Sequence, residues 1–179
     1  MARLKDLYRN QIIKELMSER QYKNVNQVPE ITKVVINAGV GRSVTNAKFM
    51  EEAVDVLKQI TGQVPITAKA RKSIAGFKIR EGMDIGVSVT LRDVKMYEFL
   101  DRLVSVALPR VRDFRGLKPT AFDGHGNYSL GIREHLVFPE ISFEEANAPI
   151  SLQVNIITTA KNDEEAKRLL ILLGFPLRS

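Results

Sequence analysis

The sequence predicts an α+β fold: a two-layer sandwich in which helices cover one face of a mainly antiparallel sheet and leave the other face open and polar. The first observation behind this prediction is that segments with apolar residues at helical spacing are interspersed with shorter segments that alternate apolar and polar residues. The second is that no repeat, low-complexity tract or linker interrupts the chain. We therefore expect a single domain over residues 1–179.

The first third of the chain contains a helix, a strand and a second helix. Apolar residues at helical spacing predict an amphipathic helix over residues 3–20. Pro29 separates this helix from residues 31–38, which have the composition of a strand. A second helical stripe runs over residues 49–60, and Gly62 is suited to end that helix in a left-handed conformation.

The middle third contains two short strands and a third helix. Residues 64–69 and 85–92 are the strand candidates. Asp93 lies where an N-cap is expected, ahead of an apolar stripe that ends at Ala107. Pro109 would then lie just past the end of this helix, because proline cannot continue it.

The last third begins as a loop and ends as a helix. Residues 110–127 are rich in glycine, arginine and aspartate, whereas residues 128–133 and 150–160 have the pattern of extended strands. Asn162, with Glu165 three residues later, is a capping pattern for the last helix.

Composition narrows the class of protein. The formal net charge is +6, from 27 lysines and arginines against 21 aspartates and glutamates, and there is no cysteine. The charge favours an anionic partner, with a merely basic soluble protein as the alternative. The lack of cysteine excludes disulfides, thiolate zinc sites and cysteine nucleophiles. The amino terminus is polar, and no apolar stretch approaches the ~20 residues that span a bilayer, so we expect a soluble, cytoplasmic protein without membrane association.

A run of cations lies between Asp55 and Glu81. The residues between these two acids contain no carboxylate, and most of their cations fall between Lys69 and Arg80. Such a run cannot pack into a core, because unpaired charges lose too much hydration there. Glycine, serine and Phe77 within it add the capacity to bend, to bind phosphate and to stack, which favours RNA as the partner. The cations are Lys58, Lys69, Arg71, Lys72, Lys78 and Arg80.

The predicted strands would give the sheet one polar face. Within residues 85–92 the valines share one face, whereas Ser88, Thr90 and Arg92 share the other. This second face would carry many hydrogen-bond donors and no carboxylate. That composition favours an RNA-binding platform over an ordinary solvated face, because contacts to phosphate and 2′-hydroxyl groups need donors without competing anions. The other strands contribute Lys33, Asn37, Thr67, Lys69, Ser151, Gln153, Asn155 and Thr159 to it.

The segment from Asn37 to Ser43 follows a strand and precedes a helix, as nucleotide-binding loops do. Its spacing places Val44 where the dinucleotide pattern needs a third glycine, and Arg42 where a phosphate-binding loop needs lysine. We therefore expect a flexible turn here, and no nucleotide cofactor.

Candidates for acid–base chemistry or metal binding are few. Asp123, His125 and His135 could together bind a metal, but histidines in surface loops are far commoner. No serine–histidine–aspartate order with a nucleophile elbow is present. We expect no enzymatic activity, no catalytic residue, no metal site and no cofactor.

Two phenylalanines, Phe77 and Phe114, each lie among cations. Aromatic residues flanked by arginine can stack on unpaired bases, and they can equally pin their loops to the core. Both interpretations stay open for Phe77, whereas a core contact is favoured for Phe114. The interleaved aromatic signature of the RRM fold is absent, so we do not expect base stacking across the sheet.

The segment Leu57-Lys-Gln-Ile-Thr-Gly-Gln-Val-Pro-Ile-Thr-Ala-Lys-Ala-Arg-Lys-Ser73 resembles the signature of the family of large-subunit ribosomal protein five, which binds 5S ribosomal RNA. Several long motifs in the same order make this resemblance specific, and it covers nearly the whole chain. It continues through residues 75–80, 109–116, 122–129 and 131–140 and reaches Gly174-Phe-Pro176.

The resemblance implies a structural constituent of the large subunit that attaches 5S rRNA to the large rRNA in the central protuberance. It also implies contact with P-site tRNA through the loop 71–82, and with small-subunit ribosomal protein thirteen across an intersubunit bridge. The residues expected to bind 5S rRNA are Lys33, Asn37, Gln63, Thr67, Lys69, Thr90 and Arg92. The residues expected to contact tRNA are Arg71, Lys72, Ser73, Gly76, Phe77, Lys78 and Arg80.

The hypothesised mechanism is recognition of RNA shape by a preformed polar sheet, with a mobile basic loop that reaches tRNA. The acid-bearing region after Pro139 would suit the basic partner across the bridge. Ser151 and Gln153 depart from the glycine and the acid that commonly open the last strand in the family, which leaves the contacts at that edge open. Two alternatives remain: a small metabolic or nucleotide-binding enzyme with an incidentally basic loop, and a free-standing RNA chaperone.

Overall fold

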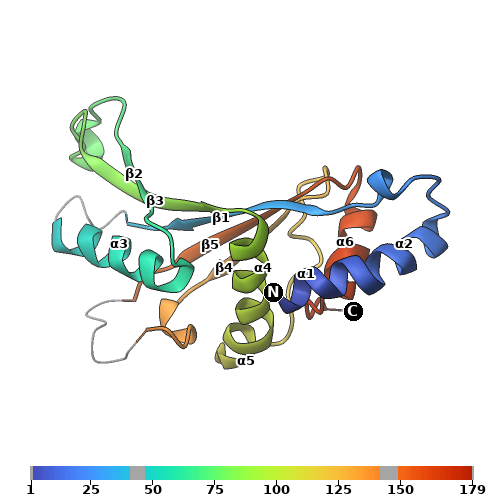
Figure 1. Ribbon diagram of the computed structural model, residues 1–179. Coiled ribbons are helices and arrows are strands. Elements are labelled where there is room, and N and C mark those ends of the chain that lie inside the picture. The colour runs from blue at the N-terminus through green and yellow to red at the C-terminus, as the bar shows by residue number, and fades with distance from the viewer. Residues whose placement is uncertain (1, 41–46, 142–148, 179) are drawn as a thin grey trace. The chain divides into compact units, whose positions relative to one another are not determined.

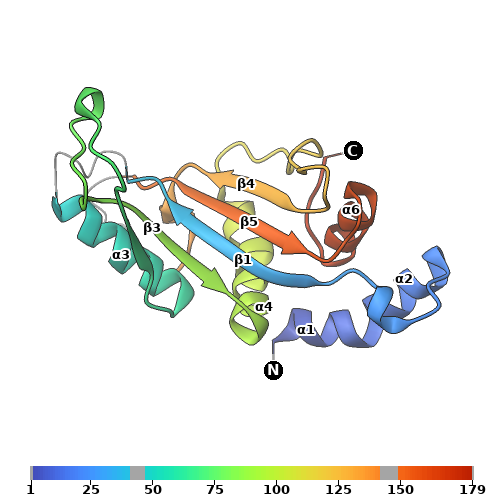
Figure 2. The same ribbon diagram turned by 90° about the horizontal axis from the view of Figure 1, so that it is seen from above.

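The predicted α+β fold is confirmed by the computed structural model, in which residues 2–40, 47–141 and 149–178 are described. The strands are β1 (Ile31–Ala38), β2 (Ile66–Lys69), β3 (Asp84–Leu91), β4 (Tyr128–Ile132) and β5 (Leu152–Thr158). They form one five-stranded sheet in the order β2-β3-β1-β5-β4, with helices packed beside it (Figure 1). Neighbouring strands run in opposite directions, as Figure 2 shows.

Four longer helical segments occur in the described part of the chain, each at a predicted position. They are α1 (Arg3–Leu7), continued by a π-helical turn at Tyr8–Ile12 into α2 (Ile13–Arg20); α3 (Ala47–Thr61); α4 (Asp93–Arg102), continued by a π-helical turn at Leu103–Ala107 into α5 (Leu108–Arg110); and α6 (Asp163–Leu172). Short 3₁₀ turns occur at Val25–Gln27, Ala75–Phe77 and His135–Val137. Pro109, predicted to lie past the third helix, instead lies in α5, near the end of this continuous helical segment.

The helix ends show which local capping signals the chain uses. Asn162 caps α6 as predicted, because its side chain accepts a hydrogen bond from the Glu165 backbone N–H at 2.9 Å. The N-cap prediction for Asp93 was wrong. The N-cap of α4 is Arg92, whereas Asp93 is the first helical residue, with a φ of 49°. Its carboxylate pairs with the Lys5 ammonium, a partner far away in the sequence.

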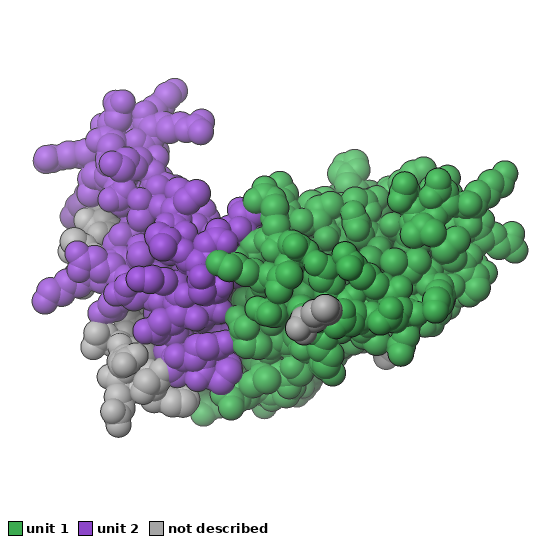
Figure 3. All heavy atoms as spheres, in the orientation of Figure 1, with its two compact units in different colours: residues 1–34, 91–130, 155–179 green, residues 35–90, 131–154 purple. Residues whose placement is uncertain are grey.

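The chain divides into two compact units (Figure 3). Unit 1 contains residues 1–34, 91–130 and 155–179, and unit 2 contains residues 35–90 and 131–154. β1 and β5 each contribute residues to both units. Compactness alone does not decide whether the units fold separately, so the single domain over residues 1–179 stays a prediction.

Unit 1 is built around packed helices, several of which are joined by ion pairs. α1 packs against α4, and the Arg3 guanidinium joins these two helices through the Asp101 carboxylate. The Arg168 guanidinium of α6 contacts the Glu15 carboxylate of α2 at an N–O distance of 3.0 Å. The buried side chains of this unit include Leu4, Tyr8, Met96, Leu100, Leu169 and Leu170.

Unit 2 is built from α3 and the strands beside it (Figures 1 and 2). Leu57 and Ile60 on α3 and Val87 on β3 are fully buried, so these apolar faces form the core of the unit. Gly62 follows α3 with a φ of 63°, the left-handed conformation predicted for it. No helix in the described ranges of either unit is long and apolar enough to cross a membrane.

Candidate nucleic-acid interface

The pairing of β2 with β3 decides which side chains share a face in unit 2. Ile66 lies opposite Ser88, and Thr67 lies opposite Val87. Directly opposed residues of an antiparallel pair project from the same face. The face predicted for Thr67 was therefore wrong, because Thr67 shares the side of the buried Val87. Ile66, which is 73% exposed, takes the place beside Ser88 that a polar residue was expected to fill.

Lys69 lies at an irregularity in the pairing of β2 with β3. The register shifts between Ala68, which pairs with Gly86, and Lys69, which pairs with Asp84. The shift leaves Ile85 without a partner on β2, and side-chain alternation does not hold through such an irregularity, so the pairing places Lys69 opposite Asp84 at the end of the strand pair. The prediction of a surface without carboxylates was wrong at this end of the strand pair, because β3 begins one residue earlier than expected and presents the exposed Asp84 opposite Lys69.

The structure joins Gln63 and Thr90 directly. Gln63 Nε2 donates to the Thr90 carbonyl oxygen at 3.2 Å, and both residues are half-buried. This hydrogen bond fixes the chain between α3 and β2 against β3. Asn37 on β1 is exposed in the same unit. We call the side of unit 2 that carries Asn37, Ser88 and Thr90, together with Gln63 at its rim and Lys69 at the end of β2, the platform.

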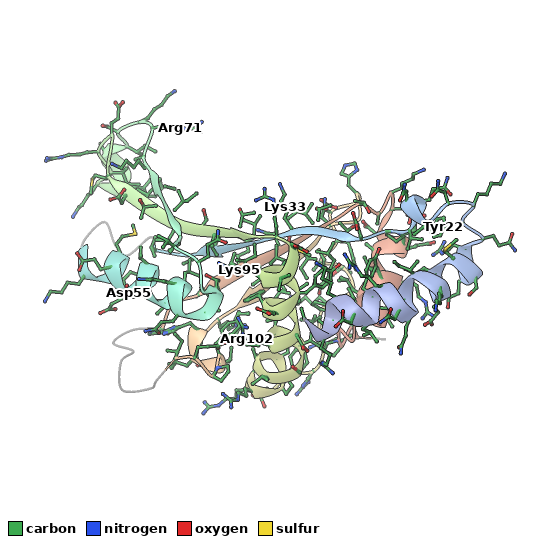
Figure 4. The ribbon with its side chains drawn as sticks, viewed as in Figure 1. Tyr22, Lys33, Asp55, Arg71, Lys95 and Arg102 are labelled. Carbon is green, nitrogen blue, oxygen red and sulfur yellow. The ribbon has the colours of Figure 1, made fainter. Side chains whose placement is uncertain are left out.

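Two residues predicted to bind 5S rRNA lie in unit 1. Lys33 is half-buried on β1, and Figure 4 shows its side chain projecting on the side away from α4. Arg92 is exposed, directly after β3. The predicted set is thus divided between the units, with Asn37, Gln63, Thr67, Lys69 and Thr90 in unit 2.

The predicted mobile loop is a hydrogen-bonded hairpin, formed by residues 70–83. The Ala70 N–H donates to the Met83 carbonyl oxygen at 2.8 Å and closes its base. Further out, Ile74 and Ile79 exchange two hydrogen bonds of 2.9 and 3.1 Å. The Ser73 hydroxyl oxygen accepts the Glu81 N–H at 2.9 Å, so this serine serves the hairpin itself. These bonds hold the backbone as an ordered ribbon.

The tip of the hairpin is a 3₁₀ turn that exposes an aromatic ring. Phe77 is 71% exposed, which excludes the interpretation that it pins the loop to the core. Lys78 follows with a φ of 56°, a left-handed conformation that turns the chain back. Gly76 has open space around it. By contrast, Phe114 in unit 1 is half-buried, in partial agreement with its predicted core contact.

The cations of the hairpin have no acidic partner among the described residues of the protein. Figure 4 shows side chains, Arg71 among them, projecting outward from the ribbon. Each cation is exposed, and none forms an ion pair within the described ranges of the chain. Exposed positive charges in an ordered frame form a surface suited to phosphate. They are Arg71, Lys72, Lys78 and Arg80.

Asp123 and His135, which were considered for acid–base chemistry or metal binding, make hydrogen bonds that stabilise the fold. His135, expected at the surface, is 1% exposed, and its Nδ1 accepts the Ile150 N–H at 3.1 Å. The only sequence signal was the apolar run Leu136-Val-Phe138 that follows it. The Asp123 carboxylate accepts hydrogen bonds from the side chain and backbone of Asn127 and from the His125 N–H, which lower its pKa to about 2. No metal-binding cluster occurs among the residues that the structure describes.

Some predicted features lie outside the described residues. These are Gly41 to Val44 of the supposed nucleotide loop, and the acids Glu144 and Glu145 of the proposed bridge region. Ser151, which departs from the usual family pattern at the last strand, lies in the described part of the chain. The Ser151 hydroxyl donates to the Arg133 carbonyl oxygen at 3.2 Å, and the Ser151 carbonyl oxygen accepts the Gly39 N–H at 3.0 Å. Ser151 therefore joins the start of the last strand to the segments that contain Arg133 and Gly39.

The fold and this surface define a class of protein. An open strand face next to a hairpin with exposed, unpaired cations is typical of a nucleic-acid-binding α+β protein.

Comparison with known proteins identifies the family. Residues 24–80 match the family model described as ribosomal protein L5, and residues 84–177 match the model of the C-terminus of the same ribosomal family. The chain is 55% identical over 179 residues to the large ribosomal subunit protein uL5 of Geotalea uraniireducens, with both chains covered completely. It is 55% identical over 177 residues to that of Synechocystis, covering 99% of this chain and 98% of the relative. For Ligilactobacillus salivarius the values are 56% over 174 residues, with 97% of each chain covered.

The chain belongs to the ribosomal protein L5 family. It is a structural, non-enzymatic constituent of the large ribosomal subunit, and its partner is ribosomal RNA. Membership of the family places it in the bacterial ribosome and so in the cytoplasm. The predicted resemblance and the predicted lack of enzymatic activity are confirmed.

Proposed function

We propose that the platform binds 5S ribosomal RNA and that the hairpin 70–83 contacts P-site tRNA. The observation that carries the proposal is the hairpin: an ordered ribbon whose cations have no acidic partner among the described residues, continuous with an open strand face. Unneutralised cations on a fixed backbone favour phosphate, since binding releases counterions without first breaking ion pairs in the protein.

For 5S rRNA, the platform combines one positive charge with neutral hydrogen-bonding groups. Lys69 supplies the charge at the end of the strand pair, and the side chains of Asn37 and Thr90 supply amide and hydroxyl groups. Such a surface suits ribose hydroxyls and phosphates more than base edges. Lys33 and Arg92 of unit 1 remain in the proposal as further phosphate contacts.

For tRNA, the hairpin presents an aromatic ring flanked by cations. Phe77 can stack on a base or pack on a ribose, while the neighbouring cations contact phosphates. Because Lys69 lies on the platform and Arg71 on the hairpin, the boundary between the two RNA contacts falls at the buried Ala70.

The two contacts can be separated with two variants. The platform variant carries Asn37→Ala, Lys69→Gln and Thr90→Val, changes that remove polar groups without opening a large cavity. The hairpin variant carries Arg71→Gln, Lys72→Gln, Lys78→Asn and Arg80→Gln, with asparagine at 78 because it tolerates the left-handed conformation. We expect the platform variant to lose 5S rRNA affinity by tenfold or more in filter binding. The hairpin variant should keep that affinity within about threefold and release P-site tRNA faster from ribosomes.

A charge-matched control makes this experiment decisive. Substituting glutamine for Arg9, Lys14, Arg20 and Lys23, all exposed in unit 1, removes the same charge as the hairpin variant. This control should bind 5S rRNA and retain tRNA as the parent chain does. Equal 5S binding by the platform variant and the parent would refute the platform assignment. Parallel loss of both RNAs in the hairpin variant would refute the division between the contacts.

We further propose the small-subunit contact implied by the family resemblance. The acids after Pro139 include Glu140, which the structure describes. Reversing their charge with Glu140→Lys, Glu144→Lys and Glu145→Lys should weaken cross-linking to small-subunit protein thirteen in assembled ribosomes. Unchanged cross-linking would place the bridge elsewhere on the chain.

The alternative to a dedicated 5S rRNA contact is broad RNA binding of the kind that a chaperone shows, which the exposed cations would also allow. A chaperone would bind tRNA and bulk RNA about as well as 5S rRNA, so competitors would displace 5S rRNA at similar concentrations. The proposed dedicated partner requires that excess tRNA displaces 5S rRNA poorly.

A further inference from the structure

The hairpin 70–83 contains a tight turn in its returning arm, the arm that leads from the tip to β3. The Met83 N–H donates to the Arg80 carbonyl oxygen at 3.2 Å, which closes a four-residue turn over residues 80–83. Gly82, at the third position of this turn, has a φ of 84°. Type II turns require a positive φ at that position, and glycine adopts it without steric cost. We call residues 80–83 the base turn.

Two residues of the base turn oppose a single residue of the outgoing arm. The Gly82 N–H donates to the Ala70 carbonyl oxygen at 2.9 Å, while the Ala70 N–H donates to the Met83 carbonyl oxygen at 2.8 Å. Two residues against one define a β-bulge, and a glycine with positive φ in its first place is the G1 type. A bulge bends its strand and increases the local twist. The hairpin therefore changes direction at the base turn.

The backbone of the base turn is held in place by hydrogen bonds. In addition to the bonds from Gly82 and Met83, the Glu81 N–H donates to the Ser73 hydroxyl oxygen at 2.9 Å, and the Arg80 N–H donates to the Met83 sulfur at 3.1 Å. Every backbone N–H of the base turn thus has an acceptor. Ala70, which receives the bulge, is 6% exposed, so the bend is attached to a buried part of unit 2.

A second irregularity follows on the same arm. The pairing of β2 with β3 is regular from Ile66 to Ala68, whereas Ile85 has no partner on β2. The departures from a regular ladder are therefore concentrated where the hairpin joins the strand pair. Figure 1 shows the hairpin rising from β2 and β3 on the side away from α3.

We propose that Gly82 is a positioning residue, which sets the direction in which the hairpin leaves the strand pair and so where its tip presents Phe77 and the cations to tRNA. The inference rests on the proposed function, because the direction matters only if the hairpin contacts tRNA. A fixed direction favours binding, since a preorganised backbone loses little further entropy when a ligand binds.

Gly82 acts through its backbone conformation and needs no contact of its own with RNA. A Cβ added at this position would meet nothing within 4 Å, so a substitution acts through the positive φ and not through a clash. A β-branched residue strongly disfavours a positive φ, whereas asparagine tolerates it. This difference separates loss of the conformation from loss of glycine as such.

The test compares three variants with the parent chain. Gly82→Val disfavours the positive φ, and Gly82→Asn keeps it. Gly131→Val on β4 is the matched control, because Gly131 is exposed, has no positive φ and would also have nothing within 4 Å of an added Cβ. Equal melting temperatures establish that the variants are folded. If Gly82→Val lowers the melting temperature, Gly82→Ala repeats the test with a smaller side chain.

The direction of the hairpin is measured by the distance between two spin labels. The chain has no cysteine, so Gln59→Cys on α3 and Ala75→Cys near the tip give two unique labelling sites, both exposed and both in unit 2. We expect the parent, Gly82→Asn and Gly131→Val to share one distance distribution. Gly82→Val should shift its mean by about 3 Å, the rise of one strand residue, because the bulge is lost.

The consequence for RNA is measured with unlabelled variants. We expect ribosomes that carry Gly82→Val to release P-site tRNA about threefold faster or more, because the displaced tip no longer meets its contact. Gly82→Asn and Gly131→Val should retain tRNA as the parent does. All three variants should keep 5S rRNA affinity within about twofold, since the platform is unchanged.

The proposal is overturned if Gly82→Val and the parent give the same distance, or if Gly82→Asn shifts it as far as Gly82→Val does. A displaced tip with unchanged tRNA release also overturns it, when the hairpin variant described above releases tRNA faster. Unchanged release by that hairpin variant refutes instead the proposed tRNA contact, and the distance alone then decides whether Gly82 sets the direction of the hairpin.

Discussion

His135 is a residue whose side chain suggests chemistry but serves the fold. It exchanges two hydrogen bonds with Ile150: Nδ1 accepts from the Ile150 N–H at 3.1 Å, and the His135 backbone N–H donates to the Ile150 carbonyl oxygen at 3.1 Å. Burial lowers the pKa of the imidazole below its ordinary value of 6.5, so the folded protein favours the neutral ring. The residue joins the 3₁₀ turn after β4 to the segment entering β5.

The stability of the protein should therefore depend on pH through His135. The His135 imidazole has a lower pKa in the folded state than in the unfolded state, so below pH 6.5 the unfolded state binds more protons. The contribution of His135 to the free energy of unfolding is therefore complete above pH 6.5 and falls as the pH drops below it. Urea unfolding between pH 7.5 and 5 measures the effect. His135→Asn should remove most of this dependence and cost about 1–3 kcal/mol at pH 7.5, because the buried hydrogen bonds are disturbed. The exposed His125→Asn is the control for loss of an imidazole at a solvent-accessible position. An unchanged profile for His135→Asn would contradict the assignment.

At the scale of elements, β2 shows the limit of alternation as a guide to faces. All four of its residues are exposed, so apolar burial gives the strand no preferred phase. The pairing with β3 sets the phase instead, and it puts Ile66 rather than Thr67 on the platform side. The hairpin beyond β2 shows a similar limit, since its cross-strand hydrogen bonds join Ile74 to Ile79 within a run that composition alone describes only as a loop.

A pair of lysine substitutions tests this register through RNA binding. Ile66→Lys places a new cation on the platform side, whereas Thr67→Lys places one on the opposite side of the same strand. We expect Ile66→Lys to tighten 5S rRNA binding and to steepen its salt slope by about 0.7–0.9, the value for one added phosphate contact. Thr67→Lys adds the same net charge and should change the slope little. The reverse order of effects would show that the register or the platform is wrongly assigned.

At the scale of the whole molecule, the cations differ in whether a carboxylate of the protein neutralises them. Arg3, Lys5 and Arg168 on the helices of unit 1 pair with carboxylates, whereas the cations of the hairpin in unit 2 have no ion-pair partner among the described residues. The net charge of +6 understates how positive the hairpin is, because aspartates and glutamates elsewhere in the chain offset its cations.

The two compact units should still unfold together. β1 and β5 pass from one unit into the other, so unfolding either unit breaks strands that the other one needs. Differential scanning calorimetry should show one transition whose calorimetric and van't Hoff enthalpies agree. The hairpin variant is a useful control and should leave the transition in place, since its substitutions are all exposed. Two resolved transitions would mean that the chain contains two domains and not one.

The sequence by itself determined the features that depend on near neighbours and on composition. The Asn162 cap, the Gly62 terminus and the apolar stripes of the helices involve residues within a few positions of each other, so each was predicted correctly. The cationic character of the hairpin follows in the same way from its residues alone.

Only the tertiary structure decided what depends on distant partners. Lys5 pairs with the Asp93 carboxylate, β3 sets the phase of β2, and the backbone of Ile150 binds the buried ring of His135. The pairing or isolation of each cation belongs to this group as well. The physical reason is that a local pattern specifies the conformation of a segment, whereas register, burial and charge neutralisation are properties of contacts between segments.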